Sequence, residues 1–502
     1  MNIKRAKNEI KNALRAYLSR DASGAYRIPP VRQRPILLMG PPGIGKTQIM
    51  EQIADETGVG LVCYTITHHT RQSALGLPYI EHRTYDGQEH AVTEYTMSEI
   101  IASVYRQMEQ SGVREGILFL DEINCISETL TPMMLQFLQC KTFGNQRLPE
   151  GWVVVAAGNP PEYNKSVRDF DVVTLDRVKR IDVTEDFAVW KEYAYRRGIH
   201  GAVLSYLEIR RDHFYRIEAT ADGMQFATAR GWEDLSELIQ AYEALGIPVD
   251  REVISQYIQL PRIAGDFANY LLLYDKYRRT YHVDEILDGT WERVRASELA
   301  AAPFDEKLGV LGLLLSRLSD AARDAYRADA LADALHADLA AVRDAAPEPA
   351  ADALASLLHA RRDALARRRA AAPADRDALT LLSRETRRLE ELSHALAAAQ
   401  EEDPFGRLKT LFGQDVQARA DAAGRAGRQL ENAFAFLDEA LGDSQELVMF
   451  ATELTANYFT SWYIQNFGCD AYYAHNERLL FDDARERLMG KISEARRMEA
   501  GR

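Results

Sequence analysis

The sequence predicts an α/β protein in which helices cover both faces of a parallel sheet, followed by two all-helical regions. Between Pro35 and about Val183, helical patterns alternate with the apolar runs "ILLM", "LVCYTI", "GILFLDE", "WVVVAAGN" and "RIDV". These runs are unbroken and do not alternate with polar residues, which indicates strands buried on both faces. From about residue 184 the spacing of apolar residues becomes helical.

We expect three domains along the chain. A nucleotide-binding core with an N-terminal helix spans 1–183, a helical lid spans 184–295, and a helical C-terminal domain spans 296–502. Between Tyr326 and Phe405 there is no aromatic residue, and Ala, Arg, Asp and Leu dominate. Leu and Ala at helical spacing, interrupted by prolines, predict helical hairpins in the segment 320–430, with disorder as the alternative. The aromatic-rich stretch that follows predicts packed helix.

Composition restricts the class of protein. The chain has 502 residues, a net charge of −14 and four scattered cysteines without a C-x-x-C pair. The acidic balance argues against nucleic acid or an anionic membrane as the main partner. The cysteine pattern argues against a disulfide framework or structural zinc. With no apolar signal-peptide core and no apolar run long enough to cross a bilayer, we expect a cytoplasmic protein.

The stretch "GPPGIGKT" directly follows the apolar run "ILLM" and precedes a helical pattern. A Gly-rich turn between a strand and a helix presents successive backbone N–H groups and the positive helix end to phosphates. We therefore expect nucleotide phosphates to contact the whole stretch: Gly40, Pro41, Pro42, Gly43, Ile44, Gly45, Lys46 and Thr47. Lys46 would reach the β- and γ-phosphates, and the Thr47 hydroxyl would bind Mg²⁺.

Two further strands end in polar residues. "GILFLDEIN" ends in Asp121 and Glu122, and "WVVVAAGNPPEY" reaches Asn159 after its apolar run. Ligands of open α/β sheets bind at the carboxyl ends of strands. We expect Asp121 to hold Mg²⁺, Glu122 to polarise an attacking water, and Asn159 to orient that water or contact the γ-phosphate. The acidic pair favours hydrolysis over nucleotide storage.

Taken in order, "GPPGIGKT", "LFLDEIN", "VVVAAGNP" and "TLDRVKRIDV" resemble the AAA+ ATPases, specifically the MoxR group. The resemblance covers roughly residues 30 to 285. It includes an insert in the second helix at about 68–98, with "GLPYI", and a hairpin at about 140–151, with "LPEGW". The dynein-related and gas-vesicle ATPases share much of this pattern.

The resemblance implies a role for each matching residue. Gly40 to Thr47 would be Walker A, Asp121 and Glu122 Walker B, and Asn159 sensor 1, with ATP and Mg²⁺ as ligands. Arg177 matches the arginine finger, but Val178 stands where the family commonly has Phe, which leaves Arg180 as a rival. Arg230 in "ATARGWEDL" matches sensor 2.

An arginine finger acts on a neighbouring subunit, so the resemblance implies a homo-oligomeric ring, by family a hexamer. The expected function is ATP-driven remodelling or maturation of a protein client, with a von Willebrand factor A domain protein as partner. Two alternatives stay open. One is a DNA-acting motor in restriction, defence or translocation, although the hairpin offers only Lys141 and Arg147 as cations. The other is a nucleotide-gated assembly scaffold.

Overall fold

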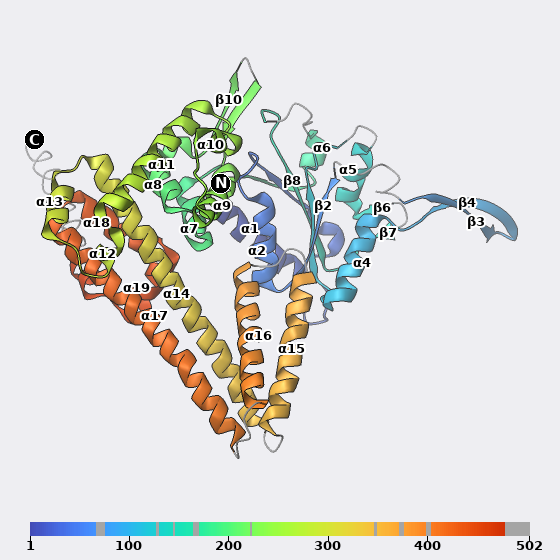
Figure 1. Cartoon of the computed structure of the whole chain (residues 1–502). Coiled ribbons are helices and arrows are strands. Elements are labelled where there is room, and N and C mark those ends of the chain that lie inside the picture. The colour runs from blue at the N-terminus through green and yellow to red at the C-terminus, as the bar shows by residue number, and fades with distance from the viewer. Residues whose placement is uncertain are drawn as a thin grey trace, which may run out of the picture. The chain divides into compact units, whose positions relative to one another are not determined.

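The computed structural model describes residues 1–66, 76–126, 130–143, 146–163, 170–220, 223–345, 349–370, 376–397 and 403–476. The chain divides into two compact units (Figure 1). The first unit contains Met1–Val189, Thr228–Arg230 and Ala364–Leu379. The second contains Trp190–Ala227, Gly231–Asp363 and Thr380–Arg502.

The first unit is built on a five-stranded sheet with the order β2-β5-β8-β1-β9. Its strands are β1 (Ile36–Met39), β2 (Gly60–Thr65), β5 (Gly116–Asp121), β8 (Trp152–Gly158) and β9 (Lys179–Asp182). Its helices are α1 (Ile3–Leu18), η1 (Pro30–Arg32), α2 (Lys46–Thr57), α4 (Glu99–Ser111), α5 (Thr131–Cys140) and α6 (Val172–Leu175). Every pairing within the sheet is parallel, so the α/β prediction is confirmed, and the five apolar runs are its five strands.

Helices cover both faces of this sheet because successive strand residues point to opposite sides. Ile36 and Leu38 of β1 pack with α1 and α2, around buried residues such as Ile10 and Met50. Leu37 packs on the other face, in a cluster that includes residues of α4 and α5. A strand buried on both faces has no room for alternating polar residues, which explains the unbroken apolar runs.

Two hairpins interrupt the alternation of strands and helices. The first pairs β3 (Pro78–Tyr85) with β4 (Gln88–Tyr95), and Figure 1 shows it projecting away from the sheet. It falls within the expected insert, whose first part, 68–75, lies outside the described residues. The second pairs β6 (Thr142–Phe143) with β7 (Gln146–Arg147), at the place of the expected second hairpin.

The lid region is mostly helical. Its helices are α7 (Phe187–Arg197), α8 (Gly201–Ile209), η3 (Arg211–His213), α9 (Ala229–Leu245), α10 (Arg251–Tyr257), α11 (Pro261–Tyr281), α12 (Val283–Leu287) and α13 (Arg293–Ala301). It also contains an antiparallel hairpin of β10 (Arg216–Thr220) and β11 (Gly223–Ala227), which the helical reading of this region did not predict. Gly223, with φ of 121°, begins the second strand in a conformation that disfavours a helix.

The C-terminal region is all helical where the structure describes it. Its helices are α14 (Phe304–Asp344), α15 (Ala350–Ala370), α16 (Arg376–Ala397), α17 (Pro404–Leu441), α18 (Gln445–Ala456) and α19 (Tyr458–Phe467). α15 begins directly after Pro349, one of the prolines that predicted a break, whereas Pro347 and Pro373 lie outside the described residues. None of the described helices is both long enough and apolar enough to cross a membrane.

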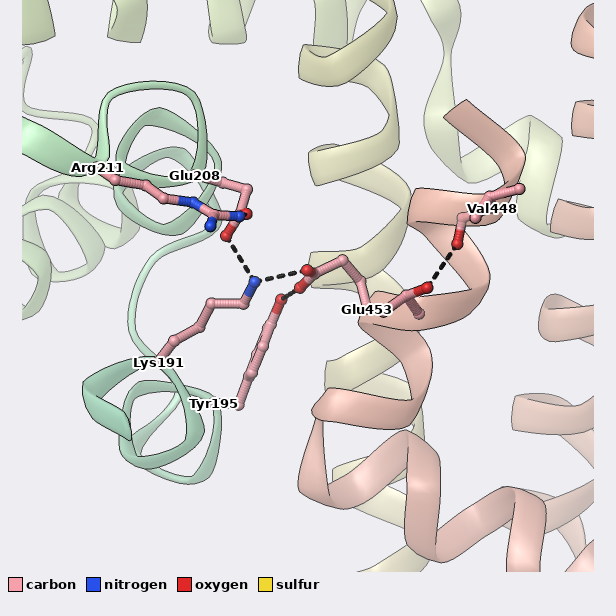
Figure 2. A network of polar contacts seen from close by, with 7 residues as sticks. Lys191, Tyr195, Glu208, Arg211, Val448 and Glu453 are labelled. Atoms are coloured by element: carbon pink, nitrogen blue, oxygen red, sulfur yellow. Dashed lines mark hydrogen bonds and ion pairs between the residues drawn. The ribbon is translucent and has the colours of Figure 1, made fainter. Parts of the chain in front are cut away.

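In the second unit, an ionic network joins lid helices to a C-terminal helix (Figure 2). The Lys191 ammonium of α7 lies 2.6 Å from the Glu208 carboxylate of α8 and 2.5 Å from the Glu453 carboxylate of α18. The Tyr195 hydroxyl donates to Glu453 at 2.7 Å. All three charged side chains are largely buried. Removing one partner would leave another buried charge uncompensated, so the network holds these helices together.

Parts of α14, α15, α16 and α17 share a separate apolar cluster, which we call the helical arm. Its buried residues are Leu335, Leu339, Val342, Ala353, Leu354, Leu358, Leu389, Leu392, Leu396 and Leu408. Leucine and alanine fill the space between these four helices without any aromatic ring in the buried set. The helical-hairpin interpretation of this segment therefore holds for its described residues.

Candidate active site

The phosphate-binding stretch forms a tight turn between β1 and α2. Gly45 is the N-cap of α2 and has φ of 90°, a left-handed conformation that favours glycine. Gly40 lies so close to the neighbouring strand that a Cβ atom there would stand 2.7 Å from the Val183 carbonyl oxygen. These two glycines are therefore required by backbone geometry, and the turn leads directly into the amino end of α2.

Lys46 is the first residue of α2, and its side chain is buried, with 8% exposed. Its ammonium donates to the carbonyl oxygens of Gly40 and Pro41 and to Asn159 Oδ1, each at 2.8 Å. Burial lowers the pKa of Lys46 to about 8, against the opposing influence of Asp121. A phosphate oxygen at this site would favour the charged ammonium and reverse that shift.

Thr47 and Asp121 meet across the gap between α2 and β5. The Thr47 hydroxyl donates to Asp121 Oδ2 at 2.9 Å. Hydroxyl and carboxylate oxygens are hard ligands of the kind that Mg²⁺ prefers, and Mg²⁺ usually keeps several waters and takes only one or two protein carboxylates. These two residues, which sequence places 74 positions apart, therefore fit a magnesium site shared with substrate phosphates.

Glu122 follows β5 in an unusual backbone conformation. Its φ of 57° places a residue with a Cβ in the left-handed region, which costs conformational energy. Its backbone N–H donates to Asp121 Oδ1 at 2.9 Å and stabilises that turn. Asp121 thus uses one oxygen toward Thr47 and the other toward the Glu122 backbone. Because Glu122 directly follows β5, it lies at the carboxyl edge of the sheet.

Asn159 follows β8, the strand between β5 and β1, and so lies between the two motifs that the sequence singled out. Its position depends on Asn124, which the sequence analysis did not select although it belongs to "GILFLDEIN". Asn124 is buried, and its amide donates to the Asn159 carbonyl oxygen at 2.8 Å. Gly158 makes room for it, since a Cβ atom there would lie 2.6 Å from Asn124 Oδ1. The available signal was an Asn two residues after the acidic pair, at the end of the same strand motif.

Arg230 is the second residue of α9 and lies near the phosphate loop. A Cβ atom on Gly43 would stand 3.5 Å from Arg230 Cβ, so the two backbones approach closely. The Arg230 charge also contributes to the lowered pKa of Lys46, after the larger effect of burial. The structure therefore brings Arg230 to the same place as Lys46, Asp121, Glu122 and Asn159.

Arg177 lies elsewhere. It precedes β9, whose first residue pairs with Ile36 and whose last pairs with Met39, next to the phosphate loop. Arg177 is thus at the amino edge of the sheet, roughly 15 Å or more from the carboxyl edge by strand geometry. Its side chain is exposed and makes no salt bridge among the described residues, although its charge helps to lower the pKa of Asp171, after the larger effect of the hydrogen bonds from Thr174. Its rival Arg180 pairs with Asp182 at 2.8 Å.

Residues 35–178 match a family model described as the AAA domain of the dynein-related subfamily. These residues form an AAA+ domain. The match begins just before β1 and ends just before β9, so it contains Lys46, Asp121, Glu122 and Asn159. Nucleotide binding, usually with Mg²⁺, and nucleotide hydrolysis are the general properties of this family. The comparison with curated proteins gives no match.

Proposed function

We propose that the chain is an ATP-hydrolysing AAA+ subunit of MoxR type. In this proposal it forms a hexameric ring that remodels or matures a protein client, together with a von Willebrand factor A domain partner. The observation that carries the hydrolytic part is the meeting of Thr47, Asp121, Glu122 and Asn159 around Lys46 at one edge of the sheet. The oligomer and the client rest on further observations, given below.

The chemistry assigned to each residue follows from its position. Lys46 would exchange its contacts to two loop carbonyls for phosphate oxygens and neutralise their charge. Thr47 and Asp121 would hold Mg²⁺, which supplies charge neutralisation between the phosphates when bound. Glu122 would accept hydrogen bonds from the attacking water, and Asn159 would orient that water. Arg230, close to Gly43, would add a second cation to the phosphates.

The position of Arg177 supports the ring. At the amino edge of its own sheet it is too far from its own phosphate loop to contact a nucleotide there. An exposed guanidinium that makes no salt bridge among the described residues is available to bind a phosphate of an adjacent subunit, although Asp171 lies within its electrostatic range. Arg180, already paired with Asp182, is less available. We therefore assign the arginine finger to Arg177.

The β3–β4 hairpin supports a protein client. Both of its strands are largely exposed along their whole length. Tyr79 and Ile80 are large apolar residues with 47% and 71% of their surface exposed. Exposed apolar residues on a projecting hairpin suit contact with a protein chain. The hairpin also carries acidic residues such as Glu81 and Glu89, which disfavour a nucleic-acid backbone.

The test is a Glu122→Gln variant, which should bind ATP and stall before hydrolysis. It is purified from its own host with ATP and Mg²⁺, and everything that copurifies is identified. A Lys46→Met variant, which should not hold the phosphates, is the matched control for nucleotide-dependent capture. We expect a stoichiometric protein with Glu122→Gln that is absent with Lys46→Met.

The outcomes separate the proposed functions. A captured von Willebrand factor A domain protein supports the full proposal and identifies the client pathway. Nuclease-sensitive nucleic acid without such a protein overturns it in favour of a DNA-acting motor. ATP turnover in Glu122→Gln equal to that of the unaltered chain overturns the assignment of the hydrolytic residue and revives a nucleotide-gated scaffold.

A further inference from the structure

A small pocket lies at the base of the β6–β7 hairpin, at the edge of the sheet opposite the phosphate loop. It has about 20 Å³ of open space, and its lining includes Lys141, Arg147, Glu150 and Trp152. Trp152 begins β8 and pairs with Gly116, whereas the other end of β8 pairs with Met39. The pocket and the phosphate loop are therefore separated by the length of β8, about 20 Å for seven residues.

Lys141 is a buried cation without a carboxylate partner among the described residues. It caps α5, and only 9% of its surface is exposed. Its ammonium has one polar contact, to Gln33 Oε1 at 3.4 Å. Gln33 is oriented for this contact because its amide donates to the Tyr17 and Ile28 carbonyl oxygens. Burial, followed by the nearby charge of Arg147, lowers the pKa of Lys141 to about 8.

Comparison with Lys46 shows what Lys141 lacks. Both ammonium groups are buried, and burial lowers both pKa values to about 8. Lys46 donates to three oxygen atoms at 2.8 Å, whereas Lys141 has a single long contact. An ammonium group has three donors, and a buried donor without an acceptor is costly. Lys141 therefore has unused capacity to bind an anion.

A second cation lines the same pocket. Arg147, at the end of β7, is exposed, and its guanidinium has no ion pair or hydrogen bond within the described part of the chain. The Trp152 side chain is only 2% exposed, and its indole Nε1 has no acceptor among the described residues. The Lys141 carbonyl accepts from the Leu148 N–H at 2.9 Å, which closes the hairpin and keeps these residues together.

The charge and size of the pocket favour a carboxylate. Lys141 and Arg147 supply two positive charges, and Glu150 on the lining supplies one negative charge, which leaves an excess of one. Glu150 also lies within electrostatic range of Arg20, so its charge is shared with a second cation. A space of about 20 Å³ accepts a group little larger than one water. One oxygen of a carboxylate fits that space.

We propose that this pocket is an anion site that binds a single carboxylate group, held by Lys141 and Arg147. The carboxylate belongs to an acidic protein side chain or to a small free carboxylate, since both present the same chemistry. The site does not use the nucleotide-binding edge, so it stands independently of the hydrolytic proposal. A carboxylate bound there would attach the β6–β7 hairpin to the molecule that carries the carboxylate.

The test measures how fast the Lys141 amine is acetylated at pH 8 in the full chain, by trace labelling and peptide mass spectrometry. Sodium formate is compared with sodium chloride at equal ionic strength. A bound carboxylate raises the lysine pKa by about one unit and therefore slows labelling at pH 8 about fivefold. Lys179, which pairs with Glu9 at 2.6 Å, is the internal control and should not change.

A matched variant and two further probes decide the result. In Arg147→Gln, an exposed substitution, the effect of formate should be lost. A hexaglutamate peptide that slows Lys141 labelling at a lower carboxylate concentration than formate identifies a protein side chain as the source, and equal potency identifies a free carboxylate. Equal labelling in formate and chloride overturns the proposal. Slowing by phosphate but not by formate overturns the carboxylate assignment.

Discussion

The AAA+ domain and the helical arm use arginine in opposite ways. Arg177 in the AAA+ domain is exposed at a sheet edge and makes no salt bridge in the described part of the chain. Arg361 in the arm contacts Asp338 of α14 at 2.5 Å and Glu385 of α16 at 2.8 Å. Asp338 and Glu385 are 2% and 5% exposed, so both carboxylates of this ion cluster are buried, whereas the Arg361 side chain is 36% exposed.

This difference separates charged residues that are expected to affect activity from charged residues that stabilise the fold. A buried pair is strongly destabilised when one partner is removed, because the other is left uncompensated. An exposed arginine without a salt bridge contributes little to folding stability, so the effect of substituting it should be measured in activity. Substitution of Arg177 should therefore mainly reduce turnover, and substitution of Arg361 should mainly reduce stability.

The largest effect is expected from Arg177→Ala. Loss of an arginine finger typically reduces phosphoryl-transfer rates by about 10³ to 10⁵, so we expect ATP turnover to be abolished while ATP binding is nearly unchanged. Steady-state turnover and equilibrium nucleotide binding measure the two properties. Arg180→Ala is the matched control and should keep turnover. Equal losses of binding and turnover in Arg177→Ala would contradict action on a neighbouring subunit.

Arg361→Met should have the opposite result. Removing the cation leaves Asp338 and Glu385 buried without it, which we expect to destabilise the arm by about 3 to 5 kcal/mol. Hydrogen exchange of peptides from α14, α15 and α16 measures this loss. Arg362→Met removes an exposed arginine that pairs with Glu390 and should cost little. Unchanged hydrogen-exchange protection of the arm in Arg361→Met would contradict a stabilising role for Arg361.

Glu385 should make the stability of the arm depend on pH. Burial, followed by its hydrogen bond to Asp338, raises the pKa of Glu385 to about 7, with Arg361 opposing. A raised carboxyl pKa favours the protonated form in the folded state. Its stabilisation is therefore present below the ordinary pKa near 4.5 and is lost as pH rises through about 7.

The size of this loss follows from the shift, and amounts to about 3 kcal/mol. In Glu385→Gln a neutral amide replaces the carboxyl, so the dependence should flatten between these pH values. Arm protection, corrected for the intrinsic exchange rate at each pH, provides the measurement. Glu390→Gln, on the same helix, should retain the pH dependence of the unaltered chain. A slope that persists in Glu385→Gln would assign the titration to another group.

The smallest effect is expected from Asn124→Ala. It removes the hydrogen bond that holds the Asn159 carbonyl, a loss of about 1 kcal/mol or a few-fold to tenfold in turnover. Asn432 makes a similar bond, to the Leu287 carbonyl at 2.8 Å, in the other unit of the chain. Asn432→Ala should therefore leave ATP turnover unchanged. Equal turnover in both variants would show that Asn124 does not position Asn159.

Sequence alone predicted the features that local pattern determines. The five strands were readable because a strand buried on both faces is an unbroken apolar run. The phosphate loop could be predicted because its glycines stand at fixed spacing between an apolar run and a helical pattern. Sequence assigned Thr47 and Asp121 to Mg²⁺ from separate motifs, and the structure adds the direct hydrogen bond between them.

The remaining features depend on contacts between distant residues. Asp338, Arg361 and Glu385 stand in a charged, alanine-rich stretch where each one resembles an exposed helix residue. Only the packing of three helices makes them a cluster whose carboxylates are buried. Lys141 likewise resembles a surface cation of a hairpin until η1 and Gln33 cover it. Burial of a charge is a tertiary property, so it leaves no periodic signal.

The continuity of α14 has a mechanical consequence. This single helix runs for 41 residues, packing on α8 and α11 in the lid and on the arm hairpins farther along. At 1.5 Å per residue it is about 60 Å long, so a tilt of about 10° at one end displaces the other by roughly 10 Å. A tilt of α14 small enough to keep its packing on the lid helices would thus displace its other end, in the arm, by about the diameter of a helix.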